Sequence, residues 1–152
     1  MSRDIDDVYR RGKYKDEAFG DKRSISDDYT GDRIFRGNTG LINKHPVNKI
    51  TDSDHVVSVS AAEKRYPDLS KDQQRSLVND RSNIAHTNAS LNREKGGMSN
   101  VAYVAQKMRD GEPLSAKTAA NMVSRQLKSE INMGVKATGM RVENAFKKFE
   151  KK

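Results

Sequence analysis

Short apolar windows with strand-like composition alternate with polar, turn-rich stretches in the middle of this chain. Residues 54–59 are rich in valine, and they are expected to form a short strand with His55 near its start. The Tyr-Pro step at residues 66–67 ends any continuation of that strand. Residues 82–87 are expected to form a second strand, directly before the asparagine that caps the next helix.

Two helices are predicted around the second strand from their capping residues. Residues 70–79 are expected to be helical, because Ser70 with Gln73 three positions later forms a capping box. Residues 88–95 are expected to form a helix that begins at an asparagine N-cap and ends at Gly96. The predicted order is therefore strand, helical insertion, strand, helix.

The last third of the chain predicts two or three further helices. Residues 99–109 carry apolar side chains at helical spacing and are followed by Asp-Gly, a typical helix end. Residues 115–130 repeat the pattern, and residues 142–149 form another apolar stripe. Gly134 and Gly139 weaken the helix between these two segments.

The first 35 residues show neither helical nor strand periodicity over a long window, so they are expected to form an irregular basic arm. Aromatic residues are interleaved with basic ones in this arm. They would either stack on nucleic acid or tether the arm to the core, and the sequence favours neither. The aromatics are Tyr9, Tyr14, Phe19, Tyr29 and Phe35.

Composition predicts a small core and a basic partner-binding surface. Hydrophobic residues make up 34% and charged residues 33% of the 152-residue chain, so a large core is not expected. The net charge is +8, and residues 93–152 hold 13 basic and 6 acidic side chains. Such a surface suits a phosphate backbone, although lysines also keep helices in solution without binding anything.

Several classes of protein are excluded or disfavoured by simple features. The chain has no cysteine, so it forms no disulfide and no cysteine-ligated structural zinc site. No apolar run approaches the roughly 20 residues that cross a bilayer, and no signal-type stretch follows the first methionine. We expect no membrane association and a cytoplasmic location.

Three short segments combine the residue types of a phosphodiester-cleaving centre. Residues 52–55 are Asp-Ser-Asp-His, residue 83 is Asn, and residues 92–95 are Asn-Arg-Glu-Lys. This combination resembles the HNH (ββα-metal, His-Me finger) endonucleases, and is most similar to the HNH domain pattern of RNA-guided CRISPR effector nucleases. The resemblance covers about residues 50–97. It departs from many family members in its long insertion, its lack of zinc-binding cysteines and its asparagine as the last ligand.

The resemblance implies a role for each residue of the motif. His55 would be the general base, because histidine takes a proton from water close to neutral pH. Asp54 and Asn92 would bind Mg²⁺, or Mn²⁺ in its place, through hard oxygen ligands. Asn83 would support catalysis by bridging the loop around His55, using the donors and acceptor of its amide.

Basic and acidic neighbours of the motif complete the expected site. Lys95 matches a basic position of the family and would contact a phosphate of the nucleic acid, as would Arg93. Asp52 matches an acidic position two residues before Asp54 and would have a supporting role. His86 is interpreted as an ordinary strand histidine, and His45 as a loop residue.

The sequence therefore predicts an α+β protein with a small ββα-metal core. We expect an N-terminal arm over residues 1–40, a nuclease core over residues 41–97 that includes the inserted helix, and a basic helical extension over residues 98–152. The main hypothesis is a metal-dependent endonuclease that hydrolyses DNA, with RNA as an alternative substrate. The second is an inactive nucleic-acid-binding or assembly module of a phage or mobile-element protein. The third is a toxin-type nuclease delivered to another cell, with the same chemistry.

Overall fold

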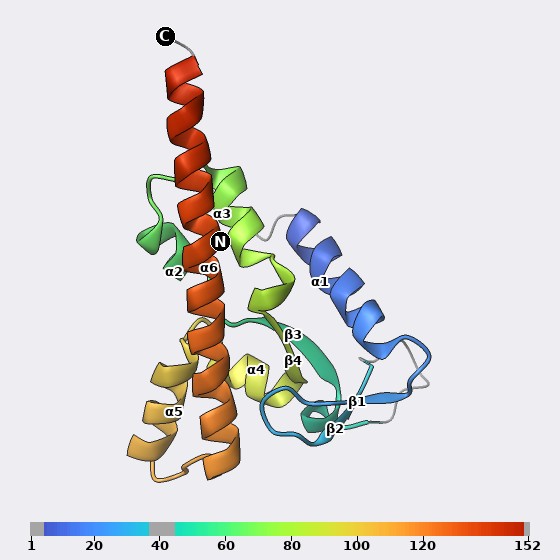
Figure 1. Ribbon diagram of the computed structural model, residues 1–152. Helices are drawn as coiled ribbons and strands as arrows, with labels where there is room; N and C mark the ends of the chain where they lie inside the picture. Colours follow the sequence, from blue (N-terminus) through green and yellow to red (C-terminus); the bar gives the residue numbers. More distant parts are fainter. Residues whose placement is uncertain (1–4, 37–44, 151–152) are drawn as a thin grey trace.

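The computed structural model describes residues 5–36 and 45–150, which form a mixed α+β fold with one very long helix along its side (Figure 1). Two small antiparallel sheets, each of two strands, lie beside that helix. The first sheet pairs β1 with β2, and the second pairs β3 with β4. The α+β class predicted from the sequence is thus confirmed.

The second sheet and the helix that follows it make up the centre of the molecule. Strand β3 (Thr51–His55) pairs with β4 (Ile84–Asn88), with Asp54 opposite Ala85. Helix α4 (Ala89–Lys95) begins directly after β4, where the Asn88 side chain accepts a hydrogen bond from the Leu91 N–H. It ends at Gly96, whose φ of 56° suits glycine. The predicted helix and both of its boundaries are confirmed.

Strand β3 ends where the sequence placed its beginning. His55 is the last residue of β3, whereas the prediction placed His55 near the start of a strand over residues 54–59. Val56 and Val57 are buried in the core and do not continue the strand. Ser58 then caps helix α2 (Val59–Arg65) by accepting from the Ala61 N–H. The valine-rich segment was misassigned because burial in a core selects the same residues as a strand does.

The segment between the two central strands is helical. Helix α3 (Lys71–Val78) has the predicted capping box, in which Ser70 Oγ accepts from the Gln73 N–H. A short 3-10 helix, η3 (Arg81–Asn83), then leads into β4, so the strand begins two residues later than predicted. Its turn is stabilised by the Asp80 side chain, which accepts from the Ser82 N–H.

The predicted irregular N-terminal arm is wrong. Residues 5–19 form helix α1 (Ile5–Phe19), and a hairpin follows from β1 (Ser24–Ser26) and β2 (Arg33–Phe35). The turn of this hairpin is joined to β4 by Asp27, whose carboxylate accepts from Thr87 Oγ1, the Asn88 N–H and Asn88 Nδ2.

Three aromatics of this N-terminal segment contact the body of the protein, and the Tyr9 side chain lies outside the described residues. Phe19 and Tyr29 are fully buried, and the Tyr14 hydroxyl donates to the Asn79 carbonyl. Strands of three residues, such as β1 and β2, leave little periodic signal, and long-range contacts determine which positions of this segment are buried. For Tyr14, Phe19 and Tyr29, the structure supports tethering among the two roles left open. A 3-10 helix, η2 (Val47–Lys49), precedes β3, and Phe35 forms a β-bridge with Ile50.

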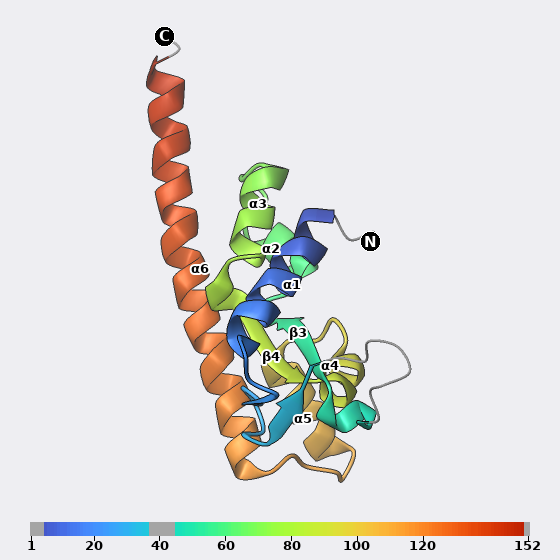
Figure 2. The same cartoon turned by 90° about the vertical axis from the view of Figure 1, so that its right-hand side faces the viewer.

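Two helices complete the chain. Helix α5 (Asn100–Arg109) lies beside the first turns of α6 (Ala116–Glu150), which runs unbroken for 35 residues (Figures 1 and 2). The expected weakening at Gly134 and Gly139 is wrong, because Met133 and Ala137 are buried against α2 and α3. Tertiary packing thus outweighs the low helix propensity of glycine.

Two apolar clusters hold these elements together. One joins α2 and α3 to α6 through Leu77, Val78 and Met133. The other joins the central strands to α4, α5 and α6 through Val56, Leu91 and Met122. No helix among the described residues has the length and apolar character needed to cross a membrane. Val56 belongs to the second cluster and Val57 to the first, so the two residues that follow the candidate base join the two cores.

Candidate functional site

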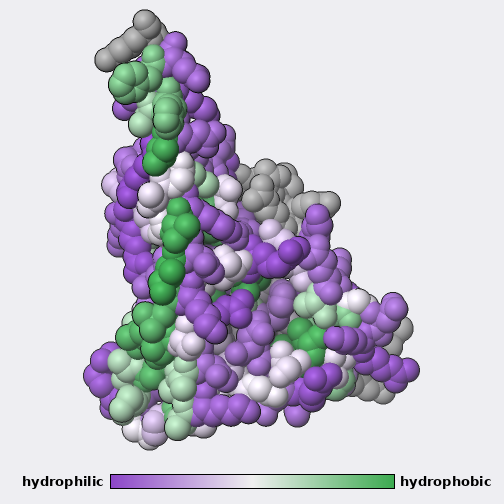
Figure 3. Space-filling model, in the orientation of Figure 1, coloured by the Kyte–Doolittle hydropathy of each residue, from purple (hydrophilic) through white to green (hydrophobic). Residues whose placement is uncertain are grey.

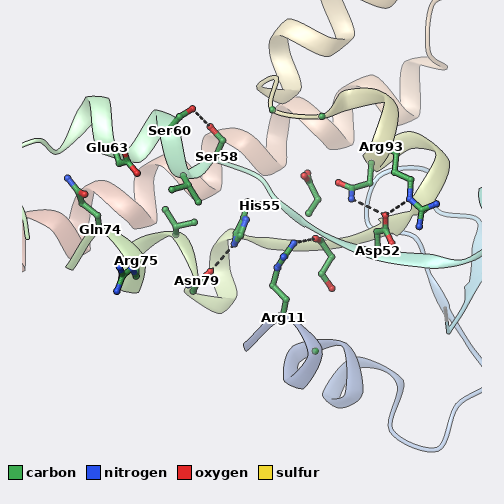
Figure 4. A pocket seen from close by; sticks show the side chains of 18 of the residues that line it. Arg11, Asp52, His55, Ser58, Ser60, Glu63, Gln74, Arg75, Asn79 and Arg93 are labelled. Carbon is green, nitrogen blue, oxygen red and sulfur yellow. Dashed lines mark hydrogen bonds and ion pairs between the residues drawn. The ribbon is translucent and has the colours of Figure 1, made fainter. Parts of the chain in front are cut away.

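An open groove of about 1150 Å³ runs along β3 and contains most of the predicted site residues. Its walls come from α1, from the segment 58–79 and from the end of α4. Figure 4 shows His55 and Asp52 on β3, with Arg11 of α1 on one side of the strand and Arg93 of α4 on the other. Side chains from widely separated parts of the sequence therefore meet in one hollow.

His55 is held at the floor of this groove by an amide. Its Nε2 lies 2.9 Å from Oδ1 of Asn79, the buried C-cap residue of α3. An amide oxygen only accepts, so the imidazole carries its proton on Nε2 and Nδ1 is the basic nitrogen. The arrangement selects one tautomer and one ring orientation, as a general base requires.

Asn83 clamps the backbone that follows His55. Its side chain accepts from the Val57 N–H at 2.8 Å and donates to the Val57 and Val78 carbonyls, both at 2.9 Å. The residue is 1% exposed, so these three hydrogen bonds form away from water. Asn83 therefore joins the end of β3 to the end of α3, which carries the partner of His55. It does not touch His55 itself through any of these bonds.

Asp54 lies at the edge of the groove, but its carboxylate is bonded to buried side chains. Its Oδ2 accepts from Lys95 Nζ at 2.6 Å and from the Tyr29 hydroxyl at 2.7 Å. Asp54 and Lys95 are 5% and 1% exposed. Burial and the neighbouring Asp54 charge raise the pKa of the Tyr29 phenol well above its ordinary value, so it remains a hydrogen-bond donor.

The buried position of Lys95 corrects its expected role. A phosphate contact requires an exposed ammonium, whereas Lys95 points into the protein and neutralises Asp54. Arg93, by contrast, has a side chain that is 60% exposed and lines the groove, as a phosphate-contacting residue would. The two basic residues of the Asn-Arg-Glu-Lys segment thus differ in position, since residues two apart on a helix point in different directions.

Asp52 and Asn92 meet directly in the groove. Asn92 Nδ2 donates to Asp52 Oδ2 at 3.1 Å, and Arg93 Nε lies 3.3 Å from the same oxygen. The structure therefore joins Asn92 to Asp52, and not to Asp54 as the expected ligand pair would require. Asp52, expected only as a supporting residue, is the carboxylate that accepts a hydrogen bond from the predicted amide ligand.

Helix α1 contributes basic groups that the sequence analysis did not identify. Arg11 Nη1 donates to the Ser53 carbonyl at 3.2 Å, and Lys15 Nζ donates to the Thr51 carbonyl at 3.1 Å. Both residues line the groove. Burial lowers the pKa of Lys15, and the nearby Asp52 carboxylate acts in the opposite direction. The segment interpreted as an irregular arm therefore forms one wall of the site.

The oxygen donors of the groove fit a hard divalent cation in chemical type. They are the carboxylates of Asp52 and Asp54 and the amide oxygen of Asn92. Among the described residues, no three His, Asp or Glu side chains form a cluster of the kind that binds a metal ion. A cation here would therefore keep several water or phosphate ligands, which is the usual coordination of Mg²⁺.

Three residues of the site gave no recognisable signal in the sequence. Asn79 is the last residue of a predicted helix, and its contact with His55 spans 24 positions. Tyr29 contacts Asp54 across 25 positions, and Arg11 reaches Ser53 across 42. The sequence showed that Asn79 ends a helix and that Arg11 and Tyr29 lie in a segment of mixed basic and aromatic residues. Neither feature predicts which distant residue each of them contacts.

Comparison of the chain with protein-family models, with curated proteins and with solved structures gives no match.

Proposed function

We propose that this protein is a metal-dependent endonuclease that hydrolyses phosphodiester bonds of DNA. The observation that carries the proposal is the groove along β3, where an oriented histidine lies with two carboxylates and an amide. Strand, strand and helix occur in the order that the HNH resemblance implies. The groove and this order of elements both support the proposal, and the order agrees with the one predicted from the sequence.

In the proposed reaction, a water molecule attacks phosphorus while Nδ1 of His55 takes its proton. A new P–O bond forms, the bond from phosphorus to the 3′ oxygen breaks, and that oxygen leaves with a proton from solvent. Bound divalent metal would supply positive charge at the scissile phosphate. Asp52, Asp54 and Asn92 are the residues that would hold it.

The substrate class follows from the charge of the groove walls. Five basic residues line the groove, and they come from elements on different sides of β3. They are Arg11, Lys15, Lys71, Arg75 and Arg93. Such a distribution suits a polyanionic backbone that extends along the groove, because several phosphates can contact basic side chains simultaneously.

The experiment is incubation of the purified protein with supercoiled plasmid in the presence of Mg²⁺, Mn²⁺ or EDTA. Nicking that requires metal is expected, and His55→Ala should reduce its rate by about 10² to 10⁴-fold through loss of the general base. The matched control is His45→Ala, since His45 lies outside the groove and stacks on Phe35. Full activity of His55→Ala would contradict the assignment of the base.

A second candidate function is a nucleic-acid-binding module without catalysis, and one observation favours it. The buried pair of Asp54 and Lys95 already balances the charge of one expected metal ligand, as a purely structural ion pair would. In that case the plasmid stays intact under every metal condition, but its migration on a gel is retarded. Arg93→Ala should then weaken binding without affecting the fold.

A further inference from the structure

Helix α6 has an apolar face that nothing in the described chain covers. Six large apolar side chains on it are between 51% and 78% exposed. We call this set the outer stripe: Leu127, Ile131, Val135, Val142, Phe146 and Phe149. Figure 3 shows it as a green band along the long helix. The opposite face of the helix is buried on the body through residues such as Met122, Met133 and Ala137.

The spacing within the outer stripe is regular. With Thr138 included, successive positions are separated by four, four and three residues, and this pattern occurs twice between Leu127 and Phe149. That is an 11-residue repeat, which averages about 3.67 residues per turn, close to the 3.6 of an ideal helix, and corresponds to a slight right-handed supercoil. An apolar face of about 33 Å, from 22 residue steps at 1.5 Å, is suited to contact another long helix.

We propose that the outer stripe binds a second copy of this chain, with the two α6 helices antiparallel. In a two-fold symmetric dimer, the same surface on each copy meets its equivalent. Lys128 and Glu143 flank the stripe on the same side, one near each end. An antiparallel pairing centred beside Val135 brings Lys128 of one helix to Glu143 of the other, twice, whereas a parallel pairing does not.

The area of the stripe is sufficient for such a dimer. Each phenylalanine can bury about 150 Å² or more, and each exposed aliphatic side chain of the stripe adds roughly 60 Å². Two copies would therefore bury on the order of 1,000 Å² in total, which is about the minimum for a biological interface and typical of a weak one. Exposed apolar patches of this length are unusual on a monomer.

The shape of the molecule also favours an antiparallel pairing. The C-terminal turns of α6 extend past the other elements (Figures 1 and 2). At the opposite end of the stripe, α5 adds the exposed apolar residues Val101 and Met108. Val101 lies beside the start of the stripe, since its N–H donates to Gln126. The protruding end of one copy would therefore rest beside α5 of the other.

Gly139 is accounted for by the same arrangement. It lies in the exposed middle of α6, and a Cβ atom added to it would meet nothing within 4 Å. Nothing within one copy therefore favours glycine over alanine there, although glycine disfavours the helix. A small residue at the flank of the stripe lets a second helix approach closely. The dimer requires this space, whereas a single copy does not.

The first test is sedimentation velocity of the full chain between about 1 and 100 µM, the range in which an interface of this size associates. A concentration-dependent dimer is expected. Val135→Glu should raise the dissociation constant more than about tenfold, because it buries two like charges beside the two-fold axis. The matched control is Val47→Glu, since Val47 is 45% exposed and lies far from the stripe in sequence.

The second test determines the orientation of the helices. Lys128→Glu should weaken the dimer, and adding Glu143→Lys should restore it. Because the chain has no cysteine, single variants report contacts unambiguously. Val135→Cys should form a disulfide-linked dimer under mild oxidation, whereas Phe149→Cys should not. Efficient cross-linking of both variants would indicate a parallel pairing and would overturn the antiparallel arrangement.

Two results would overturn the proposal as a whole, one from sedimentation velocity and one from a separate vesicle-binding experiment. A monomer at all concentrations would show that the stripe does not bind a second copy. Binding of that monomer to anionic lipid vesicles, lost in Val135→Glu, would identify a membrane surface as the partner instead. Neither result depends on nuclease activity, so the proposed function is tested separately.

Discussion

The groove along β3 and the outer stripe of α6 differ in how their side chains are paired and buried. In the groove region, buried polar groups such as Asn83 and Lys95 have short hydrogen bonds to defined partners. On the outer stripe, side chains such as Phe146 and Phe149 are mostly exposed, at 66% and 78%. The polar groups of the first region find their hydrogen-bond partners within one chain, whereas the apolar side chains of the second are not covered by the described residues.

This difference shows what defines the geometry of each region. A buried polar network has a high energetic cost when one member is lost, so it defines a single geometry. An apolar stripe has no such internal requirement, and its geometry is defined only by what packs against it. Substitutions in the groove should therefore change the stability of one chain, and substitutions on the stripe should change association.

The largest effect is expected from Lys95→Met. The substitution leaves the Asp54 carboxylate buried without its cation, which should cost about 3 to 5 kcal/mol of unfolding free energy. Urea denaturation measures it. Arg93→Met is the matched control, because Arg93 pairs with Asp52 while 60% exposed and should cost below about 1 kcal/mol. Equal losses of unfolding free energy for the two variants would show that the buried Lys95–Asp54 pair stabilises the fold no more than the exposed Arg93–Asp52 pair.

A smaller loss is expected from Asn83→Ala. Removal of the amide leaves the Val57 N–H and the Val57 and Val78 carbonyls without partners, at a cost of about 1 to 3 kcal/mol. Asn92→Ala, with one hydrogen bond at the groove surface, should stay within about 1 kcal/mol in the same denaturation experiment. If Asn83→Ala were as stable as the parent, the clamp around the end of β3 would have no structural role.

A gain in stability is expected from Gly139→Ala, provided that the chain is monomeric. In the Val135→Glu background the substitution should stabilise α6 by about 0.5 to 1 kcal/mol, because alanine is the better helix former and the space is open. In the parent chain the same substitution should weaken the dimer, because the added methyl group lies at the flank of the stripe. Thermal unfolding and sedimentation measure the two effects, and a dimer unaffected by Gly139→Ala would contradict the close approach of helices there.

The smallest effect concerns pH and His86. Burial lowers the pKa of His86 below its ordinary value of 6.5, and the nearby Lys15 and Arg125 act in the same direction. The folded state therefore binds fewer protons than the unfolded state just below pH 6.5. This contribution to stability is present above pH 6.5 and is lost as the pH falls through the lowered pKa. His86→Gln should flatten the decline in denaturation free energy over that interval, and an unchanged decline would contradict the assignment.

Local signals predicted the elements that local interactions stabilise. The Ser70 capping box and the Asn88 N-cap are confirmed, because a cap uses residues within one helical turn. The helices predicted over residues 99–109 and 115–130 from their apolar periodicity are also present, the second as the first part of the longer α6. The proposed nuclease chemistry and the division into three regions stay predictions.

Elements that depend on distant contacts were predicted poorly. Helix α1 and the β1–β2 hairpin were missed, because their burial arises from distant contacts, such as that of Tyr14 with Asn79 and that of Asp27 with β4. The break expected near Gly134 and Gly139 did not occur, because burial of Met133 and Ala137 stabilises that part of the helix. In both cases tertiary packing overrode intrinsic propensity.

By itself, the sequence determined the α+β class, the capped helices around β4 and the set of residue types that could perform hydrolysis. Only the tertiary structure decided which of those residues meet. It placed Asn79 on His55, turned Lys95 inward onto Asp54, joined Asn92 to Asp52 and left one face of α6 uncovered. The physical reason is range: caps and periodicity act within a few residues, whereas ion pairs, burial and exposed faces depend on segments brought together across the whole chain.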